Sequence, residues 1–148
     1  MDLNTCKLDE AKLAGGVWWA LSRNPDGTLS GVPVRGQPGD VPAVLIRPAG
    51  VEFERALEEA RRPFLLDIRD KRLSAADERQ ILAQATAKAL WAGCHNLTVG
   101  GQPLAYRVAD AARMLAEPTW TNLLDFILLT ARDKASLLAD EEARAAGN

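Results

Sequence analysis

Several residue types are scarce in this chain, and each scarcity narrows the possible chemistry. Among its 148 residues there are only two cysteines, Cys6 and Cys94, and one histidine, His95. No Cys-x-x-Cys pair or Cys/His ligand spacing occurs, so we expect reduced thiols and no metal site. The glycine pairs lack the longer patterns that direct backbone amides at phosphates, so no nucleotide cofactor is expected either.

An excess of charge of one sign is also missing. The formal net charge is -2, and basic and acidic residues are interspersed along the chain. No broad basic field is therefore available to release counterions from a nucleic acid. No segment approaches the ~20 apolar residues of a membrane span, and the first ten residues contain no apolar run typical of an export signal. We expect no nucleic-acid partner, no membrane partner and a cytosolic location.

What remains is the composition of an ordinary globular domain. Apolar residues make up 47% of the chain and charged residues 26%, and a chain of this length can bury a real core. We predict one domain over 1–148, of the α+β class but mainly α. It would have a flexible start over 1–14, a β-hairpin region over 15–48, a helical body over 50–138 and a frayed tail over 139–148.

The hairpin region is predicted from residue types that suit strands and turns. A strand is expected at Val17–Leu21, a type I turn at Asn24–Gly27 and a pairing strand at Val41–Arg47. The stretch Thr28–Asp40, rich in Gly and Pro, indicates either a loose hairpin arm or an ordered loop. The result is a small N-terminal antiparallel β-hairpin or three-stranded sheet.

A bundle of about four helices is predicted to follow. A first amphipathic helix begins near Phe53 and ends or kinks at Pro63, because proline cannot continue a helix. Ser74 is a suitable N-cap for a second helix, which we expect to run to about Ala92. Gly93 would then cap it in the left-handed conformation.

The last part of the predicted bundle is divided by turns. Gly100 and Gly101 indicate a reversal of the chain. Apolar spacing from Val108 to Leu115 predicts a short third helix, which Pro118 interrupts. The spacing from Trp120 to Ala131 predicts a fourth helix.

One pair of residues invites a catalytic interpretation. His95 follows Cys94 directly, and an imidazole near a thiol can lower its pKa. Adjacent side chains usually point apart, however, and no third orienting group is evident. We therefore predict no catalytic residues and interpret His95 as a loop residue near a helix end.

Two segments contain more apolar side chains than can all face one core. Trp18 and Trp19 are neighbours on a strand, so only one of them can face the core. In Leu123–Leu129, Phe126 and Leu129 lie away from the main apolar stripe. Either the domain encloses this helix itself, or it offers a surface to another protein. The residues predicted to bind a partner are Trp18, Trp120, Phe126, Leu129, Leu137 and Leu138.

Short motifs follow one another in a distinctive order between residues 15 and 135. They are Gly16-Val17-Trp18, Val44-Leu45-Ile46, Phe53, Pro63-Phe64, Leu90-Trp91, Asn96-Leu97, Gly100-Gly101, Pro103-Leu104, Tyr106, Glu117-Pro118 and the apolar helix from Trp120. In this order and spacing the chain resembles the tail assembly chaperones of long-tailed bacteriophages. The insertion from Pro25 to Asp40 and the Gly93-Cys94-His95 variant depart from that pattern.

The resemblance implies a binding protein without chemistry. Such a chaperone binds the tape-measure protein in the host cytoplasm, keeps its apolar helices soluble and promotes assembly of the tail-tube protein around it. It is prone to form homo-oligomers and leaves before the virion matures. Two other hypotheses remain: a minor structural or tail-completion protein retained in the virion, and a small enzyme using Cys94 and His95.

Overall fold

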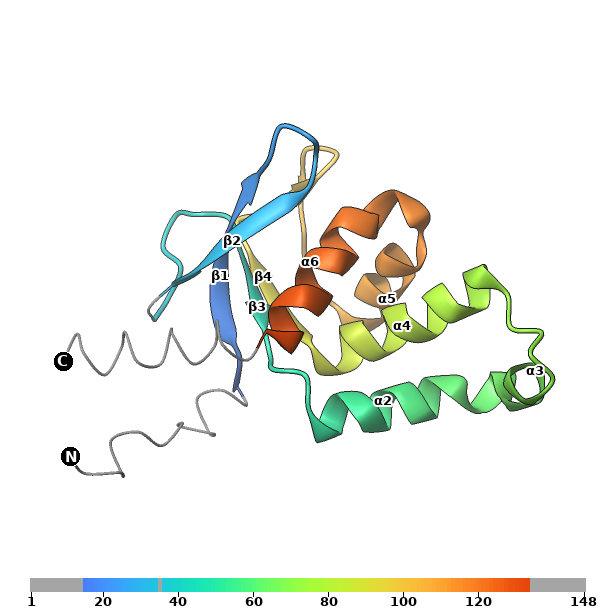
Figure 1. The fold of residues 1–148 in the computed structure, drawn as a ribbon. Coiled ribbons are helices and arrows are strands. Elements are labelled where there is room, and N and C mark those ends of the chain that lie inside the picture. The colour runs from blue at the N-terminus through green and yellow to red at the C-terminus, as the bar shows by residue number, and fades with distance from the viewer. Residues whose placement is uncertain (1–14, 35, 134–148) are drawn as a thin grey trace, which may run out of the picture.

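The computed structural model describes residues 15–34 and 36–133, in which a four-stranded antiparallel sheet is packed against helices (Figure 1). Its strands lie in the order β2-β1-β3-β4. They are β1 (Val17–Arg23), β2 (Leu29–Val34), β3 (Ala43–Ile46) and β4 (Trp91–His95). The α+β class is thus confirmed. The predicted flexible start and frayed tail lie outside the described residues.

The first three strands follow the predicted hairpin region. β1 pairs with β3, as the sequence predicted, and Trp19 lies opposite Val44. β2 pairs with the other edge of β1, so the Gly- and Pro-rich stretch contains a strand. The turn between β1 and β2 is closed by the Gly27 amide, which donates to the Asn24 carbonyl at 3.0 Å. The positive φ of Gly27, +87°, suits a residue without a Cβ.

The two neighbouring tryptophans of β1 point to opposite faces of the sheet, as strand geometry requires. Trp19 is 4% exposed and belongs to the core with Val17, Val44 and Ile46. Trp18 is half-buried on the other face, where its ring lies edge-on to His95. The helices therefore cover the face that carries Trp19.

The fourth strand corrects the prediction for residues 91–95. The helix expected to run to about Ala92 ends at Ala89, and Trp91–His95 continues as β4, paired with β3. Gly93 lies inside this strand opposite Leu45, so it is not a left-handed cap. The open edge of β3 offers a row of backbone hydrogen bonds, and this long-range pairing outweighs the local signal for a helix end.

The first helix after β3 and the beginning of the next long helix lie close to the predicted positions. α2 (Val51–Arg61) buries Phe53, Ala56, Leu57 and Ala60, and Pro63 interrupts it with the 3-10 turn η2 (Arg62–Phe64) before the short α3 (Leu65–Arg69). Ser74 caps α4 (Ala75–Ala89), accepting from the Asp77 amide at 3.0 Å, which confirms the predicted N-cap.

The chain after β4 forms a small arm and two helices. The arm is the hairpin β5 (Thr98–Val99) and β6 (Gln102–Pro103), reversed at Gly100 and Gly101, which both have positive φ. α5 (Val108–Ala116), the 3-10 turn η3 (Pro118–Trp120) and α6 (Thr121–Arg132) follow. The predicted interruption at Pro118 is confirmed. Within residues 15–34 and 36–133, no helix has the length and apolar character needed to cross a bilayer.

α6 closes the core against the sheet. Ile127 and Ala131 have no exposed surface, and Phe126 is only 8% exposed. The Phe126 ring fills the space above Gly31 of β2, so closely that a Cβ built on Gly31 would lie 2.6 Å from Phe126 Cζ. For Phe126 the structure thus agrees with the alternative in which the domain itself encloses this helix, because the absent side chain of Gly31 makes room for the ring.

Candidate functional site

An apolar hollow lies between the β5–β6 arm and α5. It consists of two adjoining pockets, of about 310 and 290 Å³, near the lower end of the range for ligand sites, about 300–1,000 Å³. Both pockets are lined by the same five apolar side chains, Trp91, Val99, Leu104, Met114 and Trp120. We call this feature the groove.

Trp91 forms the floor of the groove and is fixed by polar contacts. Its side chain is 2% exposed, and its Nε1 donates to the Gly93 carbonyl oxygen at 3.0 Å. The Tyr106 ring packs edge-on against it, with centroids 5.1 Å apart. The returning chain at Tyr106 thus covers Trp91.

Tyr106 ties that returning chain to the end of α4. Its hydroxyl lies within hydrogen-bonding reach of the Ala87 carbonyl oxygen, at 2.8 Å, and of the Trp91 carbonyl oxygen, and it can donate to one of them at a time. Burial raises the pKa of Tyr106 to about 12. The phenol therefore keeps its proton at neutral pH and acts as a structural donor.

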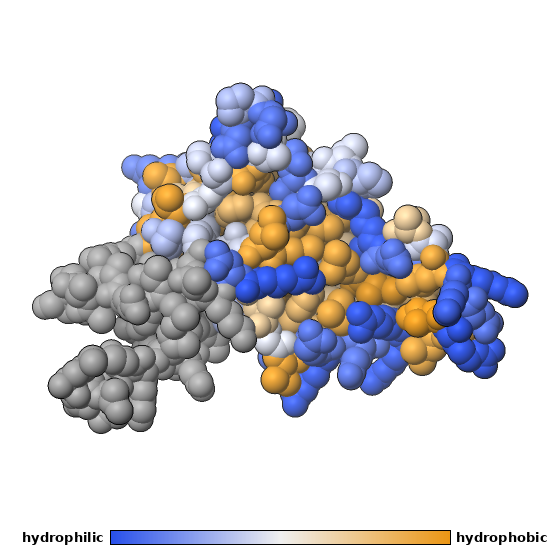
Figure 2. Space-filling view, viewed as in Figure 1, coloured by the Kyte–Doolittle hydropathy of each residue, from blue (hydrophilic) through white to orange (hydrophobic). Residues whose placement is uncertain are grey.

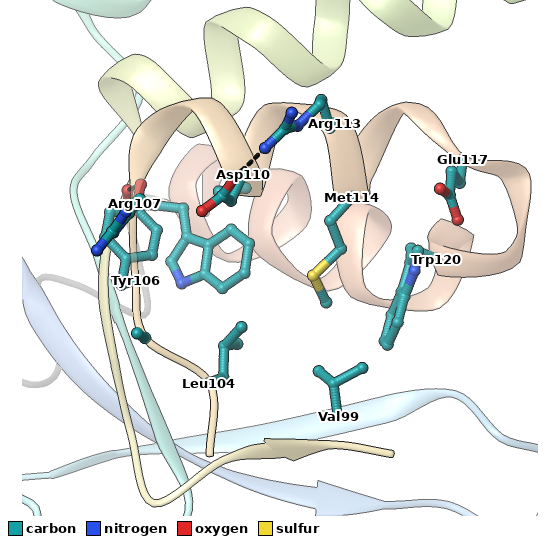
Figure 3. A pocket seen from close by; sticks show the side chains of 12 residues that line it. Val99, Leu104, Tyr106, Arg107, Asp110, Arg113, Met114, Glu117 and Trp120 are labelled. Atoms are coloured by element: carbon teal, nitrogen blue, oxygen red, sulfur yellow. Dashed lines mark hydrogen bonds and ion pairs between the residues drawn. The ribbon is translucent and has the colours of Figure 1, made fainter. Parts of the chain in front are cut away.

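Met114 and Trp120 form the helical wall of the groove. Figure 3 shows them projecting from α5 and η3 toward Leu104 and Val99 on the strand side. Trp120 is half-buried, and Val99 is 39% exposed. A partner could therefore reach apolar surface on both walls.

Arg79 of α4 holds the corner that presents Trp120. Its Nη1 donates to Thr121 Oγ1 at 2.9 Å, and its Nη2 donates to the Glu117 carbonyl oxygen at 3.0 Å. Thr121 Oγ1 in turn donates to the Pro118 carbonyl oxygen at 2.7 Å. Because these bonds connect both sides of η3 to a long helix, the position of Trp120 depends on tertiary structure.

The rim of the groove carries charges of both signs. Arg107, Asp110, Arg113 and Glu117 line its first pocket, and Arg113 pairs with Asp110. The pair is well exposed, so it contributes little to stability. An apolar floor with a mixed rim can bind apolar side chains of a partner whose flanking residues are polar.

Cys94 and His95 do not form a paired site in this structure. Cys94 Sγ donates weakly to the Leu104 carbonyl oxygen at 3.5 Å, whereas His95 Nε2 lies 2.5 Å from the Gly39 carbonyl oxygen. The two side chains alternate along β4 and so point to opposite faces. Burial raises the pKa of the Cys94 thiol, which makes the thiolate less available, whereas a nucleophilic cysteine needs a lowered pKa.

No group of three or more His, Cys, Asp or Glu side chains is placed to hold a metal ion within residues 15–34 and 36–133.

The structure places the predicted partner residues in different environments. Trp120 lines the groove, Trp18 lies on the outer face of the sheet and Phe126 is buried. Leu129 is 69% exposed but does not line the groove. Leu137 and Leu138 lie outside the described residues. The described residues of the predicted set therefore do not form one surface, and whether each binds a partner stays a prediction.

Sequence reasoning missed most of the groove. Met114 falls beside the buried Ala111 and Leu115 of α5, and it was not singled out. Val99 and Leu104 flank the Gly100-Gly101 turn, which signalled only a reversal. One sequence pattern does point to the groove. It consists of apolar residues on both sides of a glycine turn, followed by a methionine next to the apolar stripe of a helix.

Comparison of the chain with protein-family models, with curated proteins and with solved structures finds no match. The resemblance to tail assembly chaperones therefore remains a prediction from the motif order.

Proposed function

We propose that this protein is a non-enzymatic tail assembly chaperone of a long-tailed bacteriophage. It acts in the host cytoplasm, binds apolar helices of the tape-measure protein, keeps them soluble and promotes assembly of the tail-tube protein. It self-associates during this work. The observation that carries the proposal is the groove, with Trp120 and Met114 on one wall and Val99 and Leu104 on the other.

The groove suits a helical client for a physical reason. An amphipathic helix buries its apolar face in a hydrophobic groove and leaves its polar flanks at the rim. Here the floor is apolar, and the rim offers both Arg107 and Glu117 to polar flanks. A long helical protein without its assembly partners exposes such apolar faces and aggregates, so covering them requires contact area and no chemistry.

The thioether of Met114 supports the same proposal. Methionine is unbranched and polarizable, and it adapts to client side chains of different shapes. A chaperone that binds several similar helical segments benefits from such an adaptable wall beside a rigid floor. The rigid element here is the Trp91 indole, which its hydrogen bond and the Tyr106 ring hold in place.

Co-expression in bacteria tests this function. The tape-measure protein encoded by the same genome would be produced in overlapping fragments, with and without this protein, and the soluble fraction of each fragment measured. We expect at least one fragment to become soluble only with the wild-type protein. A fragment set that precipitates equally in both conditions would contradict the proposal.

Two variants locate the effect within the molecule. Met114→Glu places a charge on the groove wall and should abolish the solubility gain, because burying that carboxylate against an apolar client is costly. Leu129→Ser is the matched control, since Leu129 is exposed and outside the groove. If Leu129→Ser abolished the gain and Met114→Glu did not, the α6 surface and not the groove would hold the client.

A further inference from the structure

A second apolar surface lies at the end of the molecule farthest from the sheet, where α2, α3 and α4 meet (Figure 1). Leu65 and Leu66 are 58% and 67% exposed there, and Ile68 is 36% exposed. Three exposed aliphatic side chains within four residues are unusual for a solvated helix, because apolar area in water is unfavourable. We call residues 61–72 the α3 tip.

Basic side chains surround these aliphatic residues. The α3 tip contains five basic and two acidic residues, a net charge of +3, although the whole chain has a net charge of -2. All five basic residues, Arg61, Arg62, Arg69, Lys71 and Arg72, are exposed. Arg69 pairs with Asp70 at 3.1 Å in an exposed contact that solvent screens. In Figure 2, apolar and hydrophilic surfaces adjoin at this end of the molecule.

The α3 tip is nevertheless anchored to the body. Phe64, within the α3 tip, and Leu73, directly after it, are half-buried and pack against the core. Three backbone hydrogen bonds close the turn after α3: Asp70 N donates to the Leu66 oxygen, Lys71 N to the Ile68 oxygen and Arg72 N to the Asp67 oxygen. The last two form a Schellman motif, which fixes the backbone of Lys71 and Arg72 directly after α3.

We infer that the α3 tip is a docking site for an amphipathic helix of another protein that carries carboxylates beside its apolar face. The partner's apolar face would cover Leu65, Leu66 and Ile68, and its carboxylates would face Arg69, Lys71 and Arg72. Complementary charge fixes orientation and excludes basic partners. The inference does not need the proposed function, since no residue of the α3 tip lines the groove.

The observations favour a protein partner over an anionic lipid surface. Asp67 stands between Leu66 and Ile68, so membrane insertion of the leucines would bring a carboxylate toward the hydrocarbon. α3 is also only five residues long and presents little apolar area to a bilayer. A protein helix can pass beside Asp67 and leave it solvated at the edge of the contact.

The test uses the full chain and two synthetic helical peptides, studied by titration calorimetry. Both peptides have leucine on one face; one has glutamate along both flanks, and the other has lysine there. We expect the glutamate peptide to bind and the lysine peptide to bind at least about tenfold more weakly, as opposite and like charges predict. Added salt should lower the affinity for the glutamate peptide several-fold, because the basic side chains of the α3 tip are exposed and salt screens them.

Matched variants separate the apolar and ionic contributions. Leu65→Ser with Leu66→Ser should lower the affinity at least about tenfold, since two leucine side chains lose their burial. Arg69→Glu with Arg72→Glu should lower it similarly and remove the salt dependence. Leu129→Ser and Arg23→Glu change equally exposed residue types elsewhere and should leave the affinity unchanged. In the wild type, peptide-induced changes in amide NMR shifts should cluster in residues 64–72.

Several results would overturn the inference. Equal binding of the two peptides, absence of binding, or shift changes confined to the groove would each do so. Binding to phosphatidylglycerol vesicles that the leucine variant loses, without peptide binding, would assign the α3 tip to a lipid surface. A dimer in ultracentrifugation that only the leucine variant loses would assign it to a second copy of the chain.

Discussion

The groove and the α3 tip are both apolar surfaces, but they are built in opposite ways. The groove has a buried floor in Trp91, and Arg79 fixes the corner that presents Trp120. The α3 tip instead exposes Leu65 and Leu66 on a five-residue helix closed by local backbone bonds. The shape of the groove therefore depends on the global fold, whereas the α3 tip can be altered without disturbing the core.

The largest effect is expected at the groove floor. Trp91→Ala should lower the free energy of unfolding by about 3–5 kcal/mol, because it leaves a cavity under both pockets and removes the packing of Tyr106. Urea unfolding followed by circular dichroism measures this loss. Trp120→Ala is the control and should cost less than about 2 kcal/mol, since its side chain is already half-exposed. If the two substitutions lowered the free energy of unfolding equally, Trp91 would not be the structural base of the groove.

A smaller effect is expected at the corner. Arg79→Met should lower the free energy of unfolding by about 1–2 kcal/mol, because it removes the donors to Thr121 and Glu117 and keeps the apolar stem. Amide hydrogen exchange of residues 119–122 should become faster. Arg113→Met removes an exposed ion pair and should change stability by less than about 0.5 kcal/mol. Unchanged exchange in Arg79→Met would show that the corner holds Trp120 without this residue.

At the α3 tip, one substitution should increase stability. Lys71 has a φ of +55°, a left-handed conformation that a side chain with a Cβ adopts at a cost. Lys71→Gly should raise the free energy of unfolding by about 0.5–1 kcal/mol, since glycine is the preferred residue at this position of a Schellman motif. Lys71→Ala keeps the Cβ and should bring no gain. The prediction fails if thermal unfolding shows no difference between these two variants.

The smallest effect is expected for the exposed leucines themselves. Leu65→Ser and Leu66→Ser should each change the free energy of unfolding by less than about 0.5 kcal/mol, because they bury little surface. Leu57→Ala, in the buried face of α2, is the contrast and should cost about 2–5 kcal/mol. A loss above 2 kcal/mol at Leu65 or Leu66 would mean that the α3 tip is part of the core, and the comparison with the groove would no longer hold.

Local signals explain the parts of the fold that the sequence predicted correctly. The Ser74 side chain accepts a hydrogen bond from a backbone amide at the start of α4. Pro63 and Pro118 interrupt helices because proline lacks the backbone N–H that a helix needs. The pairing of β1 with β3 was also predicted, because both segments carry strand-forming residues and a turn separates them. The cap and the two helix breaks depend on residues close in sequence, whereas the β1–β3 pairing joins positions more than twenty residues apart and was predicted from the residue types of both strands.

The missed features depend on contacts between distant segments. β4 forms because the edge of β3 is open, and nothing within Trp91–His95 itself requires a strand. Phe126 is buried because Gly31, on a distant strand, leaves space for its ring. The groove likewise joins Val99, Met114 and Trp120 only after α5 folds back on the β5–β6 arm. Hydrophobic periodicity along one helix cannot indicate which distant segments will pack against it.

Site-specific photo-crosslinking shows directly whether the groove holds the client. A photoreactive residue would replace Met114 in one variant and Leu129 in another, each co-expressed with the tape-measure protein and illuminated in living cells. We expect an adduct with the tape-measure protein from position 114 and little or none from position 129. An adduct from position 129 with none from position 114 would contradict it.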